Sequence, residues 1–243
     1  MIVRTLSLSI CLLVSIVVLP ILTGCSGGEF GSELREKPKH ASALSPAGGT
    51  TLHLPQDQPF YITLAESHKT PGLGGKADAD AQADKKGTAE ATARVDNGGS
   101  ATASFQIGHS MKNDSDRMMN LHVRVVCDYE SAAGAAPPGP LPDAQVGLNL
   151  YARDGRNRLL TSMNLVKQAS DAGAASSKNR KEIEFSIPLG AHEWIHIYLA
   201  GGVQIETPEG RSADGVVKLT DLEMEIQQEV APPLEPVGTN TNP

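Results

Sequence analysis

Cysteine is scarce in this chain of 243 residues, which contains only three. Cys11 lies inside an N-terminal apolar run, and Cys25 follows that run directly. Cys127 is the only cysteine further along, so the sequence excludes an internal disulfide framework and a cysteine-rich metal cluster. The alternating pattern places Cys127 on the apolar side of a strand that starts near Leu121, and we expect a small buried hydrophobic residue there.

Basic residues are outnumbered, with 21 Lys and Arg against 28 Asp and Glu and a formal net charge of −7. Proteins bind nucleic acid through clustered Lys and Arg, so we expect no nucleic-acid partner. Aromatic residues make up only 4% of the chain, and Trp194 is the single tryptophan. Few aromatic side chains are therefore available to form a surface on which ring-shaped ligands could stack.

Amphipathic helical patterns are also missing after the N-terminal apolar run. Apolar residues instead recur at every second position in short runs, separated by segments rich in Gly and Pro. Residues 60–64 are a short strand candidate, and alternating runs follow at residues 103–107, 121–127, 146–150, 163–165, 183–187 and 222–226. This pattern predicts an all-β protein with a single antiparallel β-sandwich, each sheet having one wet face.

Composition divides the chain into segments. Residues 25–50 are rich in Gly, Ser, Lys and Glu without an apolar period, which indicates a flexible tether. Residues 51–228 carry the strand pattern and are long enough for one domain with a core. Within that domain, residues 66–100 are dominated by Gly, Ala, Asp and Lys, which predicts a long disordered insertion. We also expect a disordered tail over residues 229–243, which are rich in Pro and Asn.

The N-terminus has the parts of a secretory signal in order. Arg4 supplies positive charge, residues 6–21 are almost uninterrupted apolar residues, and small residues then precede a cysteine. The sequence Leu22-Thr23-Gly24-Cys25 resembles the lipobox of bacterial lipoproteins. A plain signal peptide and an uncleaved anchor are the alternatives.

The lipoprotein resemblance implies that residues 1–24 are a signal peptide and that Cys25 becomes the acylated N-terminus, carrying chains such as palmitate. Membrane lipid would then be a partner of the protein, through the acylated Cys25. Ser26 follows the cysteine, rather than the Asp that retains many such proteins at an inner membrane. The expected location is the cell envelope outside the cytoplasm, and the outer membrane where the cell has two.

The segment from Glu182 to Gln227 resembles the closing half of jelly-roll carbohydrate-binding modules and their galactose-binding-like relatives. Those domains often end with a strand, a Pro-x-Gly-Ala type of turn, an apolar strand, and a last strand containing Asp-Asp-Val or a near variant. The matching residues here are 185–191, 195–199 and 215–224, and residues 146–160 match the middle of such a domain. The resemblance implies a jelly-roll-like sandwich that binds carbohydrate. The two acids of the Asp-Asp-Val motif are reduced here to Asp221 alone. In many of those modules, acids near this strand help to hold a structural calcium.

The sequence from His192 to His196 matches the motif H-E-x-x-H. In zinc peptidases this motif lies on a helix, which brings both histidines to one zinc, and Glu193 would polarise the bound water. Pro188 and Gly190 precede the motif, and Ile195, Ile197 and Tyr198 favour a strand. In a strand the two histidines would lie about 13 Å apart, too far to share zinc. A zinc-dependent metallohydrolase is the alternative function, and the secondary structure of residues 192–200 decides it.

As a strand, the same segment directs Trp194, His196 and Tyr198 together to the face opposite the core. Asn149 and Tyr151 have the outward parity on their own strand and are expected to join this row. Aromatic rings and imidazole could stack against sugar rings, so these five side chains are the candidate ligand-binding residues. The alternative is that loops cover them, which leaves them a packing role.

The leading hypothesis is a lipid-anchored envelope protein that binds a glycan or a protein partner. It is not expected to be an enzyme and needs no cofactor or metal. The second hypothesis is a zinc hydrolase built on His192, Glu193 and His196. The third is a purely structural envelope lipoprotein.

Overall fold

The computed structural model describes residues 30–45, 47, 49–135, 144–169 and 175–230. Within these residues every regular element is a strand and none is a helix, which confirms the predicted all-β class. The strands are β1 (Ser42–Ala43), β2 (Thr51–Leu54), β3 (Ile62–Pro71), β4 (Lys76–Ala83), β5 (Ala89–Asp96), β6 (Gly99–Lys112), β7 (Met119–Ala135), β8 (Ala144–Asp154), β9 (Leu159–Ala169), β10 (Ala175–Leu189), β11 (Trp194–Thr207) and β12 (Ala213–Val230). No helix capable of crossing a membrane occurs in this part of the chain.

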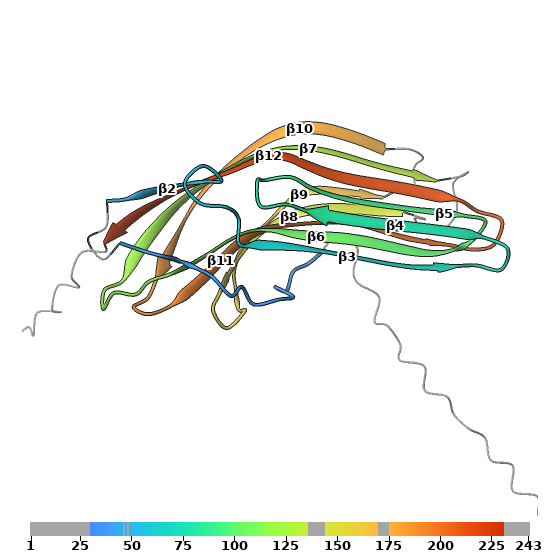
Figure 1. Ribbon diagram of the computed structural model, residues 1–243. Helices are drawn as coiled ribbons and strands as arrows, with labels where there is room; N and C mark the ends of the chain where they lie inside the picture. The colour runs from blue at the N-terminus through green and yellow to red at the C-terminus, as the bar shows by residue number, and fades with distance from the viewer. Residues whose placement is uncertain (1–29, 46, 48, 136–143, 170–174, 231–243) are drawn as a thin grey trace, which may run out of the picture.

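The strands form two facing sheets of six (Figure 1). Sheet A has the order β3-β6-β11-β8-β9, and the short β1 extends the β3 edge of β6. Sheet B has the order β10-β7-β12-β5-β4, and β2 continues the β5 edge of β12. Among β5 to β12, the order 5-12-7-10 therefore faces the order 6-11-8-9, which is the arrangement of a jelly roll.

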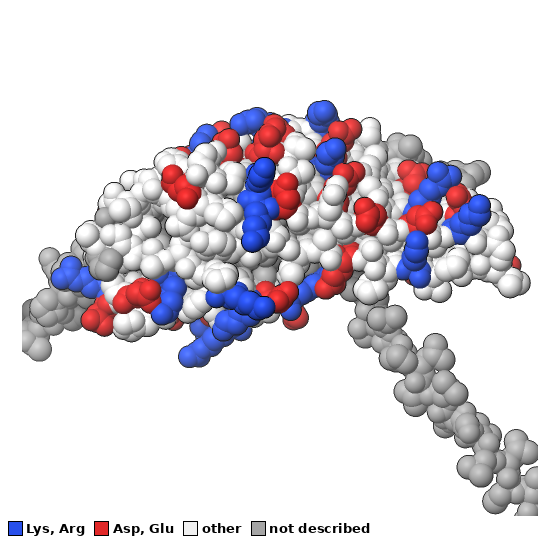
Figure 2. Space-filling view, in the orientation of Figure 1, with Lys and Arg blue, Asp and Glu red and all other residues white. Residues whose placement is uncertain are grey.

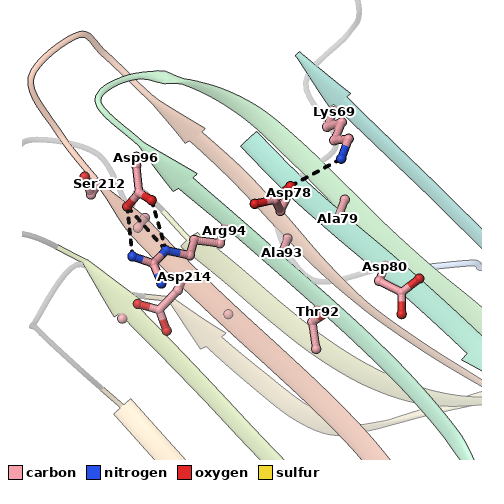
Figure 3. Close-up of a pocket in the computed structure, with 13 residues that line it drawn as sticks. Lys69, Asp78, Ala79, Asp80, Thr92, Ala93, Arg94, Asp96, Ser212 and Asp214 are labelled. Atoms are coloured by element: carbon pink, nitrogen blue, oxygen red, sulfur yellow. Dashed lines mark hydrogen bonds and ion pairs between the residues drawn. The ribbon is translucent and has the colours of Figure 1, made fainter. Parts of the chain in front are cut away.

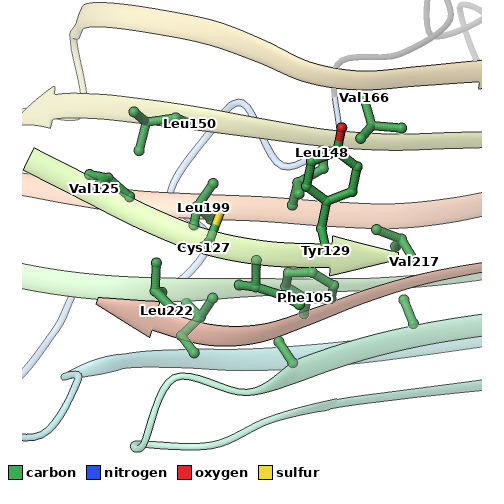
Figure 4. Close-up of a cluster of buried hydrophobic side chains, with 14 of the residues drawn as sticks. Phe105, Val125, Cys127, Tyr129, Leu148, Leu150, Val166, Leu199, Val217 and Leu222 are labelled. Atoms are coloured by element: carbon green, nitrogen blue, oxygen red, sulfur yellow. The ribbon is translucent and has the colours of Figure 1, made fainter. Parts of the chain in front are cut away.

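The core lies between the two sheets and is built by the predicted alternation. Figure 4 shows how side chains from β7, β8 and β12 interleave around Phe105. Cys127 is fully buried in this layer, and burial raises the pKa of its thiol to about 12. The prediction that Cys127 is a small buried residue of the core is therefore confirmed.

The expected disordered insertion at residues 66–100 is wrong. These residues form most of β3, all of β4 and β5, and the start of β6. On β5 the inward residues are Ala89, Ala91, Ala93 and Val95, all buried, while the residues between them face outward. The alternation is present, but alanine carries it, and its small side chain gives a weak apolar signal. Complete hydrogen-bonded ladders to β4 and β12 hold this strand in sheet B.

The expected tether is also wrong for the residues that the structure describes. Residues 30–41, which we call the strap, lie along the outer face of sheet A and lead into β1 (Figure 1, blue). Leu44 follows β1, is 2% exposed, and donates its backbone N–H to the carbonyl of Lys112 at 2.9 Å. At the other end, β12 extends to Val230 and so includes two residues assigned to the tail. Residues 1–29, with Cys25, and 231–243 lie outside the described residues.

A bulge in β12 marks the point where its neighbour changes from β5 to β2. The register shifts between Thr220 and Glu223, and Asp221 there has φ 51°. The Leu222 N–H donates to the Gly87 carbonyl at 3.2 Å. A Cβ on Gly87 would lie 2.7 Å from the Leu222 carbonyl oxygen, and Gly87 has φ 104°, so only glycine fits beside this bulge.

Candidate functional site

The H-E-x-x-H segment is not a helix. His192 lies in a turn with φ 59°, and β11 begins at Trp194. His192 Nε2 lies 3.0 Å from Asp116 Oδ1, whereas His196 Nδ1 lies 2.8 Å from Ser110 Oγ, so the two imidazoles have different partners. No three His, Cys, Asp or Glu side chains in the described ranges are grouped as metal ligands. The zinc hypothesis thus loses the helical geometry on which it depended.

The outward row predicted for β11 is present. The residues that alternate with its members, Ile195, Ile197 and Leu199, belong to the core cluster. Tyr198 pairs with Tyr151 of β8, and their rings lie 5.6 Å apart. The register therefore brings the predicted aromatic residues together on the outer face of sheet A.

Most of this row is covered by the strap. Tyr198 is fully buried and its hydroxyl donates to the Ser32 carbonyl at 3.0 Å. Gln106 of β6 donates to the carbonyls of Gly31 and Glu33 at 3.0 and 2.7 Å, and it accepts from the Arg35 N–H at 3.2 Å. These contacts make the strap part of the folded domain.

Apolar packing adds to these hydrogen bonds. Leu34 of the strap packs against a small cluster formed by Ile62, Tyr151, Tyr198 and Ala200. Asn149, further along the same face, is 3% exposed and accepts from Asn164 Nδ2 at 2.9 Å. The alternative interpretation of this row was that its side chains are covered and have a packing role. That interpretation describes Tyr198, Tyr151 and Asn149. Their role as ligand-binding residues remains a prediction.

Burial also sets the charge state of the covered row. Burial raises the pKa of Tyr198 to about 12, so its hydroxyl remains a donor at neutral pH. Burial, with a smaller contribution from Lys37 of the strap, lowers the pKa of His196 to about 4. His196 is thus neutral at pH 7, and its ring lies 6.2 Å from that of Trp194.

Trp194 is the member of the row that reaches solvent. It is half-buried at the start of β11, beside an open hollow of about 240 Å³. The hollow lies between the β8–β9 turn and the β10–β11 turn, and its lining residues are Asp154, Gly155, Arg156, Arg158, His192, Glu193 and Trp194.

Gly155 fixes one flank of the tryptophan. Its N–H donates to the Trp194 carbonyl at 2.9 Å, so the turn is hydrogen-bonded to the start of β11. A Cβ on Gly155 would lie only 2.9 Å from the Trp194 Cβ. The absence of a side chain at Gly155 lets the turn approach the tryptophan closely.

Asp154 organises the β8–β9 turn. Its Oδ1 accepts from the backbone N–H groups of Arg156 and Arg158 at 2.9 and 2.8 Å, and its Oδ2 accepts from Arg158 Nε at 2.5 Å. Burial acts to raise the pKa of this carboxyl, but the hydrogen bonds from Arg158 and Arg156 outweigh it and the pKa is lowered. Asp154 is therefore ionised, and its bonds hold the turn in one shape.

The dipeptide Asp154-Gly155 is typical of a hairpin turn, but nothing in the sequence indicates that the two arginines of this turn lie beside Trp194. Their proximity follows from the register of β8 against β11, in which Asp154 pairs with Ile195. Pairing between strands some forty residues apart leaves no local signal in the sequence. The hairpin motif could suggest a rigid turn, but not which strand it would meet.

A larger hollow of about 860 Å³ lies on the outer face of sheet B (Figure 3). Its floor is built from small residues, and no aromatic residue lines it. Four of its six charged side chains form two ion pairs: Arg94 pairs with Asp96 at 3.1 Å, and Lys69 with Asp78 at 3.3 Å. Figure 2 shows the same mixing of Lys and Arg with Asp and Glu across the visible face. This hollow has the character of a solvated sheet face.

No protein-family model matches this chain, and no curated protein matches it. Among solved structures, it is similar to the CBM22-1 xylan-binding domain from Paenibacillus barcinonensis Xyn10C, with 12% identity over 77% of this chain and 98% of that domain, at a TM-score of 0.21. It is similar to the enzymatically active domain of bacteriophage CBA120 tailspike protein 4, with 10% identity over 70% of this chain, at a TM-score of 0.26. A structure of infectious bursal disease virus, Gx strain, gives 12% identity over 81% of this chain, at a TM-score of 0.23.

The chain spans 19% of the tailspike chain and 42% of the viral chain. These scores are too low to carry an argument about fold or function. The class of the protein, a jelly-roll β-sandwich, is defined by its strand order.

Proposed function

We propose that this protein is a glycan-binding protein of the cell envelope and that Trp194 forms the centre of its binding site. The observation that carries the proposal is the placement of the only tryptophan, half-exposed, in a hollow between two hydrogen-bonded turns. A tryptophan ring offers a flat apolar surface to the C–H face of a sugar. The surrounding carboxylates, guanidinium groups and imidazole can bond to its hydroxyls.

The other predicted binding residues support the site from behind. His196 packs beside Trp194, and Tyr198 and Tyr151 hold the next part of the same face against the strap. Their burial restrains β11, so the tryptophan is presented in one orientation before the ligand arrives. Such preorganisation reduces the entropy lost on binding.

The anchor completes the proposal. If Cys25 is acylated, the strap begins only five residues later, at Phe30. Five extended residues span about 18 Å at most, so the outer face of sheet A would lie near the bilayer instead of on a long tether. Cys25→Ser should release the protein from membranes in a cell fractionation. An unchanged membrane fraction would contradict lipid anchoring and would leave the sugar site untouched.

A glycan array followed by calorimetric titration tests the sugar site directly. The full chain carrying Cys25→Ser serves as the soluble parent. Trp194→Ala should weaken glycan binding by about 1–3 kcal/mol, the loss typical of a central anchor. The matched control is Leu159→Ala, which removes an exposed apolar side chain, 51% accessible, at the start of β9. Binding that is lost equally in both variants, or in neither, would contradict the site.

A further inference from the structure

The hollow beside Trp194 is lined by two acidic and two basic side chains, but the two signs differ in how they are paired. The acidic groups nearby are already engaged. Asp154 is bonded by Arg158, Asp116 lies 3.0 Å from His192, and Glu193 accepts the Gly190 N–H at 3.1 Å. Three basic side chains near the tryptophan, Arg153, Arg156 and Lys37, form no ion pair within the described residues, and Glu193 is held by a backbone N–H alone.

Arg153 is the most unusual of the three. It is only 8% exposed, lies on the outer face of sheet A, and pairs in register with His196. Its Nη1 donates to the Asn157 carbonyl, but its buried Nε has no hydrogen-bond partner. No described carboxylate lies within ion-pair distance of this guanidinium. A buried cation without a counter-ion raises the local positive potential because water screens it poorly.

Arg156 and Lys37 bring positive charge to the surface beside the tryptophan. Arg156 lines the hollow, and its backbone is fixed by Asp154 at 2.9 Å while its side chain remains exposed. Lys37 belongs to the strap, and its field reaches His196, the neighbour of Trp194. Arg156 therefore brings unpaired positive charge into the hollow itself, and Lys37 of the strap adds positive charge near His196.

From this arrangement we propose that the Trp194 hollow selects acidic saccharides, meaning sugars that carry a carboxylate, such as uronic acids. The inference rests on the proposed glycan-binding function and specifies its ligand class. The sugar ring stacks on Trp194, and the carboxylate accepts hydrogen bonds from the Arg156 guanidinium within the field of Arg153 and Lys37. Guanidinium groups suit this task because their planar N–H groups match a carboxylate in pairs.

The test uses ligands that differ only in charge. Oligogalacturonate and oligoglucuronate are titrated into the soluble full chain, each beside its methyl ester, which keeps the ring but removes the charge. At low salt the acids should bind about tenfold more tightly than the esters, the difference expected for one charge-assisted hydrogen-bonded contact. Raising the salt concentration should reduce that ratio.

Three variants test whether the preference for acids belongs to this site. Arg156→Gln should abolish most of the difference between acid and ester, because it should weaken binding of the acid far more than binding of the ester. Lys178→Gln, the same kind of charge removal on an exposed lysine of β10 in sheet B, should change neither. Trp194→Ala should weaken acid and ester together.

The alternative outcomes separate the two proposals. Equal binding of acid and ester, with loss in Trp194→Ala, would overturn the acidic preference and retain glycan binding. Failure of both forms to bind would overturn both proposals. Binding of phosphatidylglycerol vesicles through Arg156, with no response to any saccharide, would replace the sugar with a lipid headgroup and also overturn both.

Discussion

The two sheets of this sandwich differ in what covers their outer faces. On sheet B, exposed charges pair across strands, as Arg124 of β7 does with Glu182 of β10 at 2.6 Å. On sheet A, the corresponding face carries Gln106, His196 and Tyr198, each at most 2% exposed, beneath the strap. Alternation along a strand determines which side chains face outward, but the chemistry of those side chains determines whether the face needs a cover. Trp194 lies at the border where that cover ends.

The sharpest way to test this difference is to remove a side chain from beneath the strap. Tyr198→Ala should lower the free energy of unfolding by about 3–5 kcal/mol, because it leaves a cavity and breaks the bond to Ser32. Tyr198→Phe, which loses only the hydroxyl, should cost about 1 kcal/mol. Denaturant melts measure both, with Lys178→Ala on sheet B as the exposed control. A Tyr198→Ala variant as stable as the control would show that the strap does not pack on this face.

The next largest effect is a dependence of the free energy of unfolding on pH, which arises from the buried histidines. Burial lowers the pKa of both His109 and His196 from 6.5 to about 4. The unfolded chain therefore takes up a proton as the pH falls below about 6.5, whereas the folded chain resists until about 4. The stabilisation is complete above pH 6.5 and is lost as the pH falls towards 4. The total is on the order of 3 kcal/mol for each histidine, of which about 2 is lost by pH 5.

Urea melts at pH 7 and pH 5 check this effect. His196→Gln should reduce the difference in stability between the two pH values. His122→Gln, on the exposed face of sheet B beside Ser186, is the matched control and should retain the difference. Equal pH dependence in all three proteins would mean that His196 is not buried in the neutral form.

A smaller effect comes from the hydrogen bonds that attach the strap. Gln106→Leu removes two donors and one acceptor, and it should cost about 1–3 kcal/mol, because Leu cannot bond the Gly31 and Glu33 carbonyls. The strap contains trypsin sites at Arg35 and Lys39, which should be cleaved faster in this variant. Gln82→Leu, an exposed glutamine of β4, serves as the control. Equal cleavage rates in the parent and both variants would argue that the strap is undocked.

These differences also explain what could be predicted from the sequence. The alternation of large apolar residues correctly predicts strands β6, β7 and β11. Ile195, Ile197 and Leu199 lie in the core as expected. The alanines of β4 and β5 alternate equally well, but a composition rich in Ala, Gly and Asp was interpreted as disorder.

The strap could not be predicted from any periodicity, because it is held by its backbone carbonyls and a few anchors such as Leu34. The position of the β8–β9 turn beside Trp194 depends on long-range strand register, as does the burial of Arg153 without an ion-pair partner among the described residues. Contacts of this kind are fixed only when the two strands pair. The tryptophan itself was identified from the sequence, whereas the basic groups around it required the fold.

The smallest effect is expected on sheet B, where charge pairs lie in water. Asp128→Asn removes the ion pair between Asp128 of β7 and Arg180 of β10, whose atoms lie 3.2 Å apart. Exposed pairs contribute about 0–1 kcal/mol, because solvent screens them and ordering the side chains costs entropy. The melt should therefore shift by less than about 1 kcal/mol, and the shift should shrink further at high salt. A loss as large as that of Tyr198→Ala would mean that this face is also covered, and the contrast between the two sheets would fail.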